Sequence, residues 1–138
     1  MQNKFFIAVL SATITIASIS SCKKDDHNHN ASDTEKPVIT LKEPLMNDTI
    51  SLAASSGEVH IDLAVSDNDK LHDVAINVTN GSTNIFTKSA HVDAKTYTFH
   101  DHIMPMGITG VTALTLKIDA SDHNSNADSK TVTFYVKP

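Results

Sequence analysis

The sequence predicts an all-β domain built as a two-layered sandwich of about seven antiparallel strands. Apolar residues occupy every second position in several short stretches, which is the period of a strand with one buried face. Residues that favour turns separate these stretches about every ten positions, and no stretch follows the helical period. A chain of 138 residues with one targeting segment has room for one such domain.

The first strands of the domain are short or strictly alternating. Residues 38–41, three of which are β-branched, lie between two prolines, which suits a strand at the edge of a sheet. A turn-rich connection follows, with a short strand at 50–52. Residues 58–66 alternate most regularly, and their buried face is predicted to consist of Val59, Ile61, Leu63 and Val65.

A hairpin is predicted next. Residues 74–78 alternate again, and Asn80-Gly81 supplies the residues that a two-residue hairpin turn requires. The returning strand is then residues 82–88. Counting across this turn sets Ile85 opposite Ile76 on the buried side of the sheet.

The second half of the domain holds three more predicted strands. In residues 96–103, Tyr97 and Phe99 are expected to point inward, whereas His100 and His102 point outward. The longest strand begins at residue 111, and after a loop at 122–129 the last strand buries Val132, Phe134 and Val136.

Composition excludes some functions. The net charge is −5, with 16 acidic residues against 11 basic ones, so the chain has no basic face for nucleic acid. Tryptophan is absent and aromatic residues make up 5% of the chain, which leaves little for a carbohydrate-stacking platform. Cys22 is the only cysteine, so the chain has no internal disulfide.

The first residues have the pattern of an export signal. Residues 1–4 carry one positive charge, and residues 5–19 are apolar with several interspersed hydroxyls. A membrane-spanning helix is the alternative, but 15 residues cover only about 22 Å, short of the roughly 30 Å hydrocarbon core.

The motif Ile19-Ser20-Ser21-Cys22 resembles the lipobox of bacterial lipoproteins. This resemblance implies that residues 1–21 are a cleaved signal peptide and that Cys22 is lipidated, which attaches the protein to the membrane. Lys23-Lys24-Asp25-Asp26 is similar to the signal that sends lipoproteins of Bacteroidota to the outer face of the outer membrane, and a solvated linker is the alternative. Residues 22–35 are then a disordered tether, and residues 36–138 form the domain.

The end of the chain carries a second resemblance. LTLKIDASDHNSNADSKTVTFYVKP is similar to the last two strands of bacterial immunoglobulin-like domains, and residues 36–138 resemble uncharacterised His-rich immunoglobulin-like lipoproteins of Bacteroidota. This resemblance implies an immunoglobulin-like or fibronectin-like sandwich and a location in the cell envelope. It implies no established activity. The endings of the strands at 58–66 and 111–121 also resemble one another, and in such a sandwich the loops that follow them lie at one pole.

Five residues form a candidate metal site. His100 and His102 point the same way on one strand, and antiparallel pairing of that strand with residues 58–66 brings His60 towards His102. Imidazole suits zinc or copper, and the thioethers of Met104 and Met106 would favour Cu(I). In the alternative interpretation the histidines are merely exposed and the methionines plug one end of the core.

A second candidate cation site lies in the loops at the other pole. Carboxylates from two adjacent loops could hold Ca2+, although the favoured interpretation is that Asp and Asn cap these loops. The residues are Asp67, Asp69, His72, Asp73, Asp122 and His123. His91 and Asp93 are expected to lie in the crossover between the sheets, in solvent.

Two functional hypotheses remain. The first is a lipid-anchored, non-enzymatic module that binds a protein or glycan partner through its loops. The second is a lipoprotein that buffers or delivers zinc or copper at the envelope. An enzyme is disfavoured, because the sequence has no nucleophile elbow and no glycine loop for phosphate.

Overall fold

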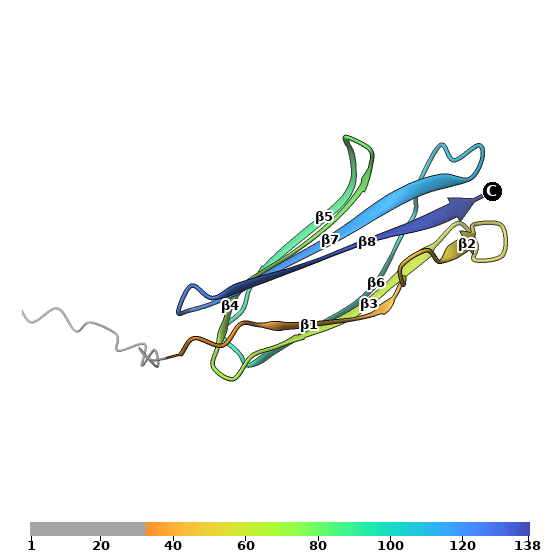
Figure 1. Cartoon of the computed structure of the whole chain (residues 1–138). Coiled ribbons are helices and arrows are strands. Elements are labelled where there is room, and N and C mark those ends of the chain that lie inside the picture. Colours follow the sequence, from red (N-terminus) through yellow and green to blue (C-terminus); the bar gives the residue numbers. More distant parts are fainter. Residues whose placement is uncertain (1–32) are drawn as a thin grey trace, which may run out of the picture.

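The computed structural model describes residues 33–138, which form a two-layered sandwich (Figure 1). The predicted signal segment, residues 1–21, and Cys22 lie outside the described residues. None of the described residues belongs to a helix long and apolar enough to cross a bilayer. The eight strands are β1 (Val38–Glu43), β2 (Thr49–Ser51), β3 (Val59–Ser66), β4 (Leu71–Asn80), β5 (Thr83–His91), β6 (Thr96–Ile103), β7 (Thr112–Asp122) and β8 (Ala127–Lys137).

The strands divide into a sheet of three and a sheet of five. The first has the order β1-β3-β6 and the second the order β2-β8-β7-β4-β5. Neighbouring strands are antiparallel except β2, which pairs parallel with β8. The short strand predicted at 50–52 is therefore present one residue earlier, and it raises the number of strands to eight. The predicted all-β sandwich is confirmed.

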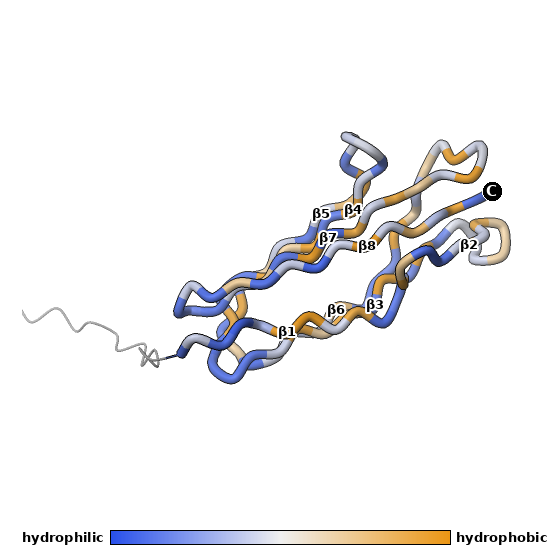
Figure 2. Tube along the Cα trace, viewed as in Figure 1, coloured by the Kyte–Doolittle hydropathy of each residue, from blue (hydrophilic) through white to orange (hydrophobic). Residues whose placement is uncertain are grey.

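The core lies between the sheets and follows the predicted alternation. Along β3 the side chains of Val59, Ile61, Leu63 and Val65 are all fully buried, and Figure 2 shows apolar and polar positions alternating along the strands. Tyr97 packs against the core and Phe99 is buried within it, as predicted. Burial of one such aliphatic side chain contributes about 1.5–3 kcal/mol, so the core is the main source of stability.

The register of the β4–β5 hairpin differs from the prediction. Asn80 pairs with Thr83, so the turn consists of Gly81 and Ser82, and Gly81 has a φ of +55°. A bulge then follows at Ile85, and Ile76 lies opposite Lys88 instead of Ile85. A bulge adds one residue to one strand and shifts every later pair. The later turn moves the partner of Ile76 by two residues and the bulge moves it by one more, so the predicted pairing of Ile76 with Ile85 is wrong.

Several strands, β5 and β8 among them, are longer than the sequence indicated. β5 continues to His91, where its last residues pair with the start of β4. β8 already begins at Ala127, which leaves a short loop at residues 123–126. Both extensions bring histidine-bearing segments to the same end of the sandwich.

We call this end the entry end, and it comprises residues 33–37, 67–70, 92–95 and 123–126. The two loops predicted to be neighbours do meet here, since the His123 amide donates to the Lys70 carbonyl at 3.2 Å. The opposite end, the far end, comprises residues 44–48, 52–58, 81–82 and 104–111. In Figure 1 the chain enters on the left and the C-terminus lies on the right.

Asp33 is attached to the entry end by two hydrogen bonds. Its carboxylate accepts from the Asn68 side-chain amide at 3.0 Å, and its carbonyl accepts from the Asn126 side-chain amide at 3.2 Å. Each bond joins it to a different loop. The chain therefore meets the domain between the β3–β4 and β7–β8 loops.

Candidate functional site

The six histidines of the described residues lie in two groups of three. His60, His100 and His102 are on the outer face of the three-stranded sheet and form the outer-face group. The entry-end group comes from β4, the end of β5 and the β7–β8 loop, and consists of His72, His91 and His123. In each group, neighbouring imidazole rings have centroid separations within the range of about 4.5–7 Å that is typical of paired aromatic rings.

The outer-face group is assembled by strand pairing. The β3–β6 register places His60 directly opposite His102, as the sequence predicted, and their ring centroids are 5.3 Å apart. His100 lies 6.3 Å from His60, and its Nδ1 is 3.8 Å from a carboxylate oxygen of Asp62. The candidate ligand atoms of Glu58, His60 and His102 all lie within 4.8 Å of one another.

Glu58 was not among the predicted ligands. It stands two residues before His60, and residues two apart share one face of a strand. Its Oε1 lies 3.9 Å from Nε2 of His102. The period-two pattern that identified the histidines could therefore have identified Glu58 as well.

The methionines predicted with this group point into solvent. Met104 is 63% exposed and Met106 is 91% exposed, beyond the end of β6. The interpretation in which they plug one end of the core is wrong. Ile103 occupies that buried position instead.

A β-bulge positions His72 in the entry-end group. The β4–β7 register shifts between Leu71 and Asp73, so that Leu71 is fully buried. Simple alternation from the buried Val74 would have put His72 in the core. Bulges re-aim side chains in this way, and His72 is turned out towards the two other histidines.

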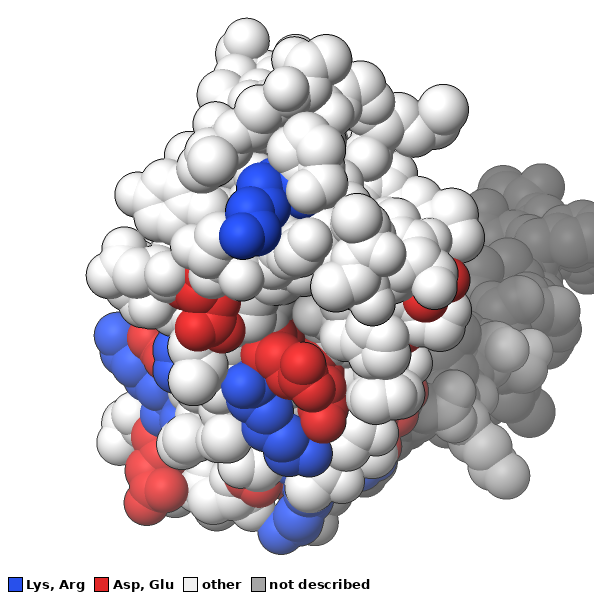
Figure 3. Space-filling view, turned by 90° about the vertical axis from the view of Figure 1, so that its right-hand side faces the viewer, with Lys and Arg blue, Asp and Glu red and all other residues white. Residues whose placement is uncertain are grey.

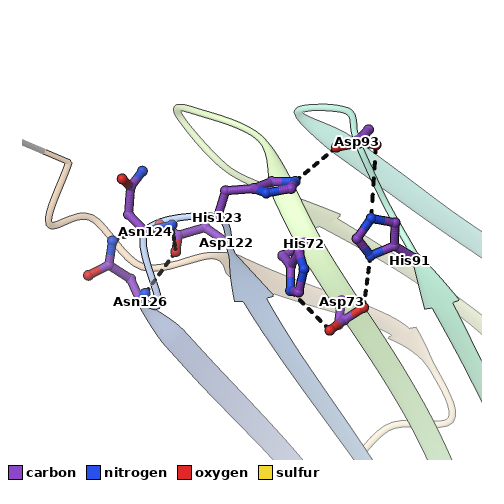
Figure 4. Close-up of polar contacts among 8 residues, drawn as sticks. All are labelled: His72, Asp73, His91, Asp93, Asp122, His123, Asn124 and Asn126. Carbon is purple, nitrogen blue, oxygen red and sulfur yellow. Dashed lines mark hydrogen bonds and ion pairs between the residues drawn. The ribbon is translucent and has the colours of Figure 1, made fainter. Parts of the chain in front are cut away.

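The rings of the entry-end group contact one another (Figure 4). The ring centroid of His72 lies 4.7 Å from that of His91 and 4.8 Å from that of His123, and the His91 and His123 centroids are 6.0 Å apart. His91 reaches this place because it pairs with Asp73 in the β4–β5 register.

Two aspartates link the three imidazoles. The Asp73 carboxylate lies between His72 and His91, with oxygen–Nδ1 distances of 3.0 and 3.2 Å. Asp93 lies between the other pair, 2.9 Å from Nε2 of His123 and 3.9 Å from Nε2 of His91. Figure 4 shows the resulting chain of alternating imidazoles and carboxylates.

The surroundings of Asp93 favour its charged form. Burial raises the pKa of this carboxyl, but the hydrogen bond to His123 and the positive charges of His123, His91 and Lys70 outweigh burial and lower the pKa below its ordinary value. Asp93 therefore presents an ionised carboxylate to the group.

The sequence prediction for this end was partly wrong in its membership. His72, Asp73 and His123 come together, but they do so with His91 and Asp93, which were expected to be solvated in the crossover. Both side chains are more than half exposed, as expected, and Asp93 lies in that crossover, but β5 extends to His91 and pairs it with Asp73. The other predicted members, Asp67, Asp69 and Asp122, contact different groups.

Asp122 caps the β7–β8 loop. Its side chain is buried and accepts hydrogen bonds from the backbone amides of Asn124 and Asn126, at 2.8 and 2.7 Å, and from the Asn126 side chain at 2.6 Å. This is the turn chemistry that the sequence favoured over Ca2+. One oxygen of Asp122 also lies within 4.8 Å of oxygens from Asp33 and Asp67.

Among these carboxylates, Asp67 has surroundings that disfavour its charged form. Burial raises its pKa, a hydrogen bond from the Asp69 amide lowers it, and the negative charges of Asp122, Asp33 and Asp69 raise it further, so the net pKa lies above the usual 3.8. Because folding disfavours the charged form, the carboxylate destabilises the domain at pH values above that range.

We expect Asp67→Asn to raise the melting temperature at pH 7, because the amide keeps an oxygen for the Asp69 amide and has no charge. The gain should vanish as the pH falls below about 4, where the wild-type group is protonated in both states. The measurement is thermal unfolding by circular dichroism across this pH range. A lower melting temperature at pH 7 would contradict the prediction.

Asp119→Asn is the matched control with the opposite sign. Burial raises the pKa of Asp119, but hydrogen bonds with Lys117 and Ser129 and the charge of Lys117 give a net lowering. The ionised form therefore stabilises the fold above the unfolded-state pKa, and this stabilisation is lost as the pH falls through the folded-state pKa. Asp119→Asn should lower the melting temperature at pH 7 and have little effect in acid.

The far end carries exposed apolar side chains. Of the six large hydrophobic residues that are exposed within residues 33–138, five lie on two of its connections, 44–48 and 104–111, namely Leu45, Met46, Met104, Met106 and Val111. Figure 3 looks onto this end, and charged side chains are sparse on the upper half of the view. Exposed apolar side chains in such number at one end of a domain often mark a protein interaction site.

Comparisons with known proteins bear on the fold. No protein-family model and no curated protein matches the chain. Among solved structures, the chain is similar to the E. coli chaperone DraB, with 7% identity, a TM-score of 0.50 and coverage of 75% of this chain and 56% of that one.

Two further structures are similar at lower scores. The fibronectin(III)-like modules of Clostridium thermocellum CbhA match with 16% identity and a TM-score of 0.46, over 72% of this chain and 96% of that one. The periplasmic chaperone SfaE matches with 13% identity and a TM-score of 0.46, over 73% and 57%. The strand topology and the similarity to DraB define the fold as an immunoglobulin-like β-sandwich.

Proposed function

We propose that this chain is a lipid-anchored envelope protein whose immunoglobulin-like domain is a non-catalytic module that binds a protein partner at its far end. The attachment of Asp33 to Asn68 and Asn126 is the observation that carries this proposal. A segment running from a lipidated Cys22 would reach the domain at the entry end. The far end would then face away from the membrane.

Chain length supports this orientation. Cys22 and Asp33 are eleven residues apart in the sequence. Even fully extended, such a segment spans at most about 40 Å, and as a flexible coil it averages about 18 Å. The entry end would therefore stay close to the bilayer surface and the far end would be the accessible one.

The chemistry of the far end supports a protein partner. Methionine side chains are flexible and polarisable, so they adapt to varied apolar surfaces. Met46, Met104 and Met106 are all more than half exposed, together with Leu45 and Val111. Burying these side chains against a partner would contribute binding free energy through the hydrophobic effect.

The anchor is tested by Cys22→Ser. We expect this variant to take up no labelled fatty acid and to leave the membrane fraction, while a Ser32→Ala variant behaves as the wild type. The measurements are metabolic labelling and fractionation of cells. Retention of Cys22→Ser in the membrane fraction would instead support an uncleaved helix at residues 5–19.

The far end is tested by photo-crosslinking in intact cells. A crosslinking residue at position 106 is expected to give a discrete protein adduct, and the same residue at Thr131, on β8, is expected to give none. Met104→Asp should weaken the adduct from position 106. Equal adducts from both positions, or none from either, would contradict a far-end interface.

Metal binding at the outer-face group is a second candidate function. Glu58, His60 and His102 bring one carboxylate and two imidazoles within 4.8 Å of one another, and this donor set suits zinc or copper. Calorimetry of the purified protein should give a saturable site that is lost in His60→Ala/His102→Ala. If Cu(I) is the ion, Met104→Ala/Met106→Ala should weaken it, and unchanged heats in both double variants would exclude this function.

A further inference from the structure

We infer that the entry-end group is a second, separate metal site, which binds a zinc-type dication through His72, His91 and Asp73, with His123 and Asp93 beside them. The site does not depend on the anchor or on the far-end partner. The donors come from β4, the end of β5 and the two loops that follow β5 and β7, so the fold itself brings them together (Figure 4).

The distances between donors suit a tetrahedral ion. Ligands about 2.1 Å from a tetrahedral Zn2+ lie about 3.4 Å from one another. Oδ2 of Asp73 lies 3.0 Å from Nδ1 of His72, and its other oxygen, Oδ1, lies 3.2 Å from Nδ1 of His91. The candidate atoms of all three residues lie within 4.8 Å of one another. Three corners of a tetrahedron are thus available after small side-chain adjustments.

The remaining two residues complete the site. The His123 ring lies 4.8 Å from that of His72, which is near enough to supply a fourth ligand by rotation. Asp93 lies 3.9 Å from Nε2 of His91, the nitrogen opposite the one that faces Asp73. A carboxylate on the far nitrogen of a ligating histidine fixes its tautomer and orientation. Asp93 has the position of such a partner for His91.

The charges at the site favour a cation over ion pairs alone. Exposed pairs of charged side chains contribute little to stability, so the ion pairs alone do not account for five converging side chains. Three protonated imidazoles in contact would also repel one another. Neutral imidazoles donating to a dication, with two carboxylates nearby, would give a site without net charge.

The donor types select the class of ion. Imidazole nitrogen is a ligand for zinc, copper and nickel, whereas Ca2+ and Mg2+ require mostly oxygen. The site offers no cysteine, because the only cysteine of the chain is Cys22. Zn2+ accommodates a set of histidines and one aspartate in tetrahedral geometry. A bound ion would also tie together β4, β5 and the β7–β8 loop.

The test is calorimetric titration of the purified, EDTA-stripped protein with Zn2+. His72→Ala/His91→Ala is expected to lose one equivalent of binding, or to weaken it at least tenfold, whereas the matched outer-face variant His60→Ala/His102→Ala keeps that equivalent. Asp73→Asn preserves the shape and should also weaken binding, with recovery in Asp73→Glu. Thermal unfolding in EDTA shows whether each variant is folded.

Cobalt provides a second readout. Co2+ in a tetrahedral site gives visible absorption bands, which should be present in His60→Ala/His102→Ala and absent in His72→Ala/His91→Ala. Full Zn2+ binding by a folded His72→Ala/His91→Ala variant would overturn the proposal. Loss of all Zn2+ binding in His60→Ala/His102→Ala would also overturn the proposal, because the ion would then bind at the outer-face group alone. Neither result bears on the lipid anchor or on the far-end partner.

Discussion

Replacing Phe134 by alanine is expected to destabilise the domain by about 3–5 kcal/mol. Phe134 is fully buried in β8, opposite Leu114 of β7, and is the largest fully buried side chain of the described residues. Truncation loses the transfer free energy of the ring and leaves a cavity that the two sheets cannot fill without separating. Since the free energy of unfolding of such domains is about 5–15 kcal/mol, this loss should raise the unfolded fraction of the protein substantially.

Urea unfolding followed by circular dichroism measures this effect. The midpoint should fall while the slope with denaturant stays constant, because a similar surface is exposed on unfolding. Met106→Ala is the matched control, since its side chain is 91% exposed, and its effect should stay within about 0.5 kcal/mol. Equal effects of the two substitutions would mean that β8 does not contribute to the core as described.

Replacing Asp122 by alanine is expected to cost about 2–4 kcal/mol, the second largest effect. The buried carboxylate accepts three hydrogen bonds from Asn124 and Asn126, and two of the donors are backbone amides. Removing the acceptor leaves these donors without a partner, and an unsatisfied buried donor costs about 1–3 kcal/mol. The cost is less than the sum for three donors, because the loop is partly open to water.

Hydrogen exchange of the Asn124 and Asn126 amides, together with urea unfolding, measures the effect. Asp48→Ala is the control, because the Asp48 carboxylate accepts from the Leu45 amide in an exposed turn, and its loss should cost no more than about 1 kcal/mol. Unchanged exchange at Asn124 and Asn126 in Asp122→Ala would show that the carboxylate does not hold this loop.

Local patterning predicted the sandwich well. The alternation in residues 59–65 and 114–120 identified the buried face of β3 and β7 residue by residue. The repeated ending of these strands also placed the β3–β4 and β7–β8 loops at one pole, where His123 and Lys70 are hydrogen-bonded. These features depend on neighbours in the chain and on one general rule of topology.

The hairpin register was not predictable in the same way. Asn80-Gly81 is a good turn sequence, but the turn forms one residue later and Ile85 becomes a bulge. Pairing of β5 with a buried β4 decides between the two registers, and this choice depends on contacts made along the whole strand. The later turn moves the partner of Ile76 by two residues and the bulge moves it by one more, so that Ile76 faces Lys88 and β5 runs as far as His91.

The two histidine groups also differ in how far the sequence could predict them. His60 and His102 could be paired in advance because their strands are neighbours in any such sandwich, and the pairing is regular. The sequence placed His72 and His123 in adjacent loops, but it did not predict that His91 joins them, because this requires the bulge beside His72 and the observed β4–β5 register. Neither of these leaves a periodic signal in the residues themselves.

The sequence by itself determined the all-β sandwich, its buried faces and the order of its strands, because side-chain alternation and turn residues act over a few positions. Only the tertiary structure decided which polar side chains meet. Bulges at His72 and Ile85 and the joining of separate loops at Asp33 depend on how two sheets pack over one core. That packing energy is shared by residues far apart in the chain, and no local stretch contains it.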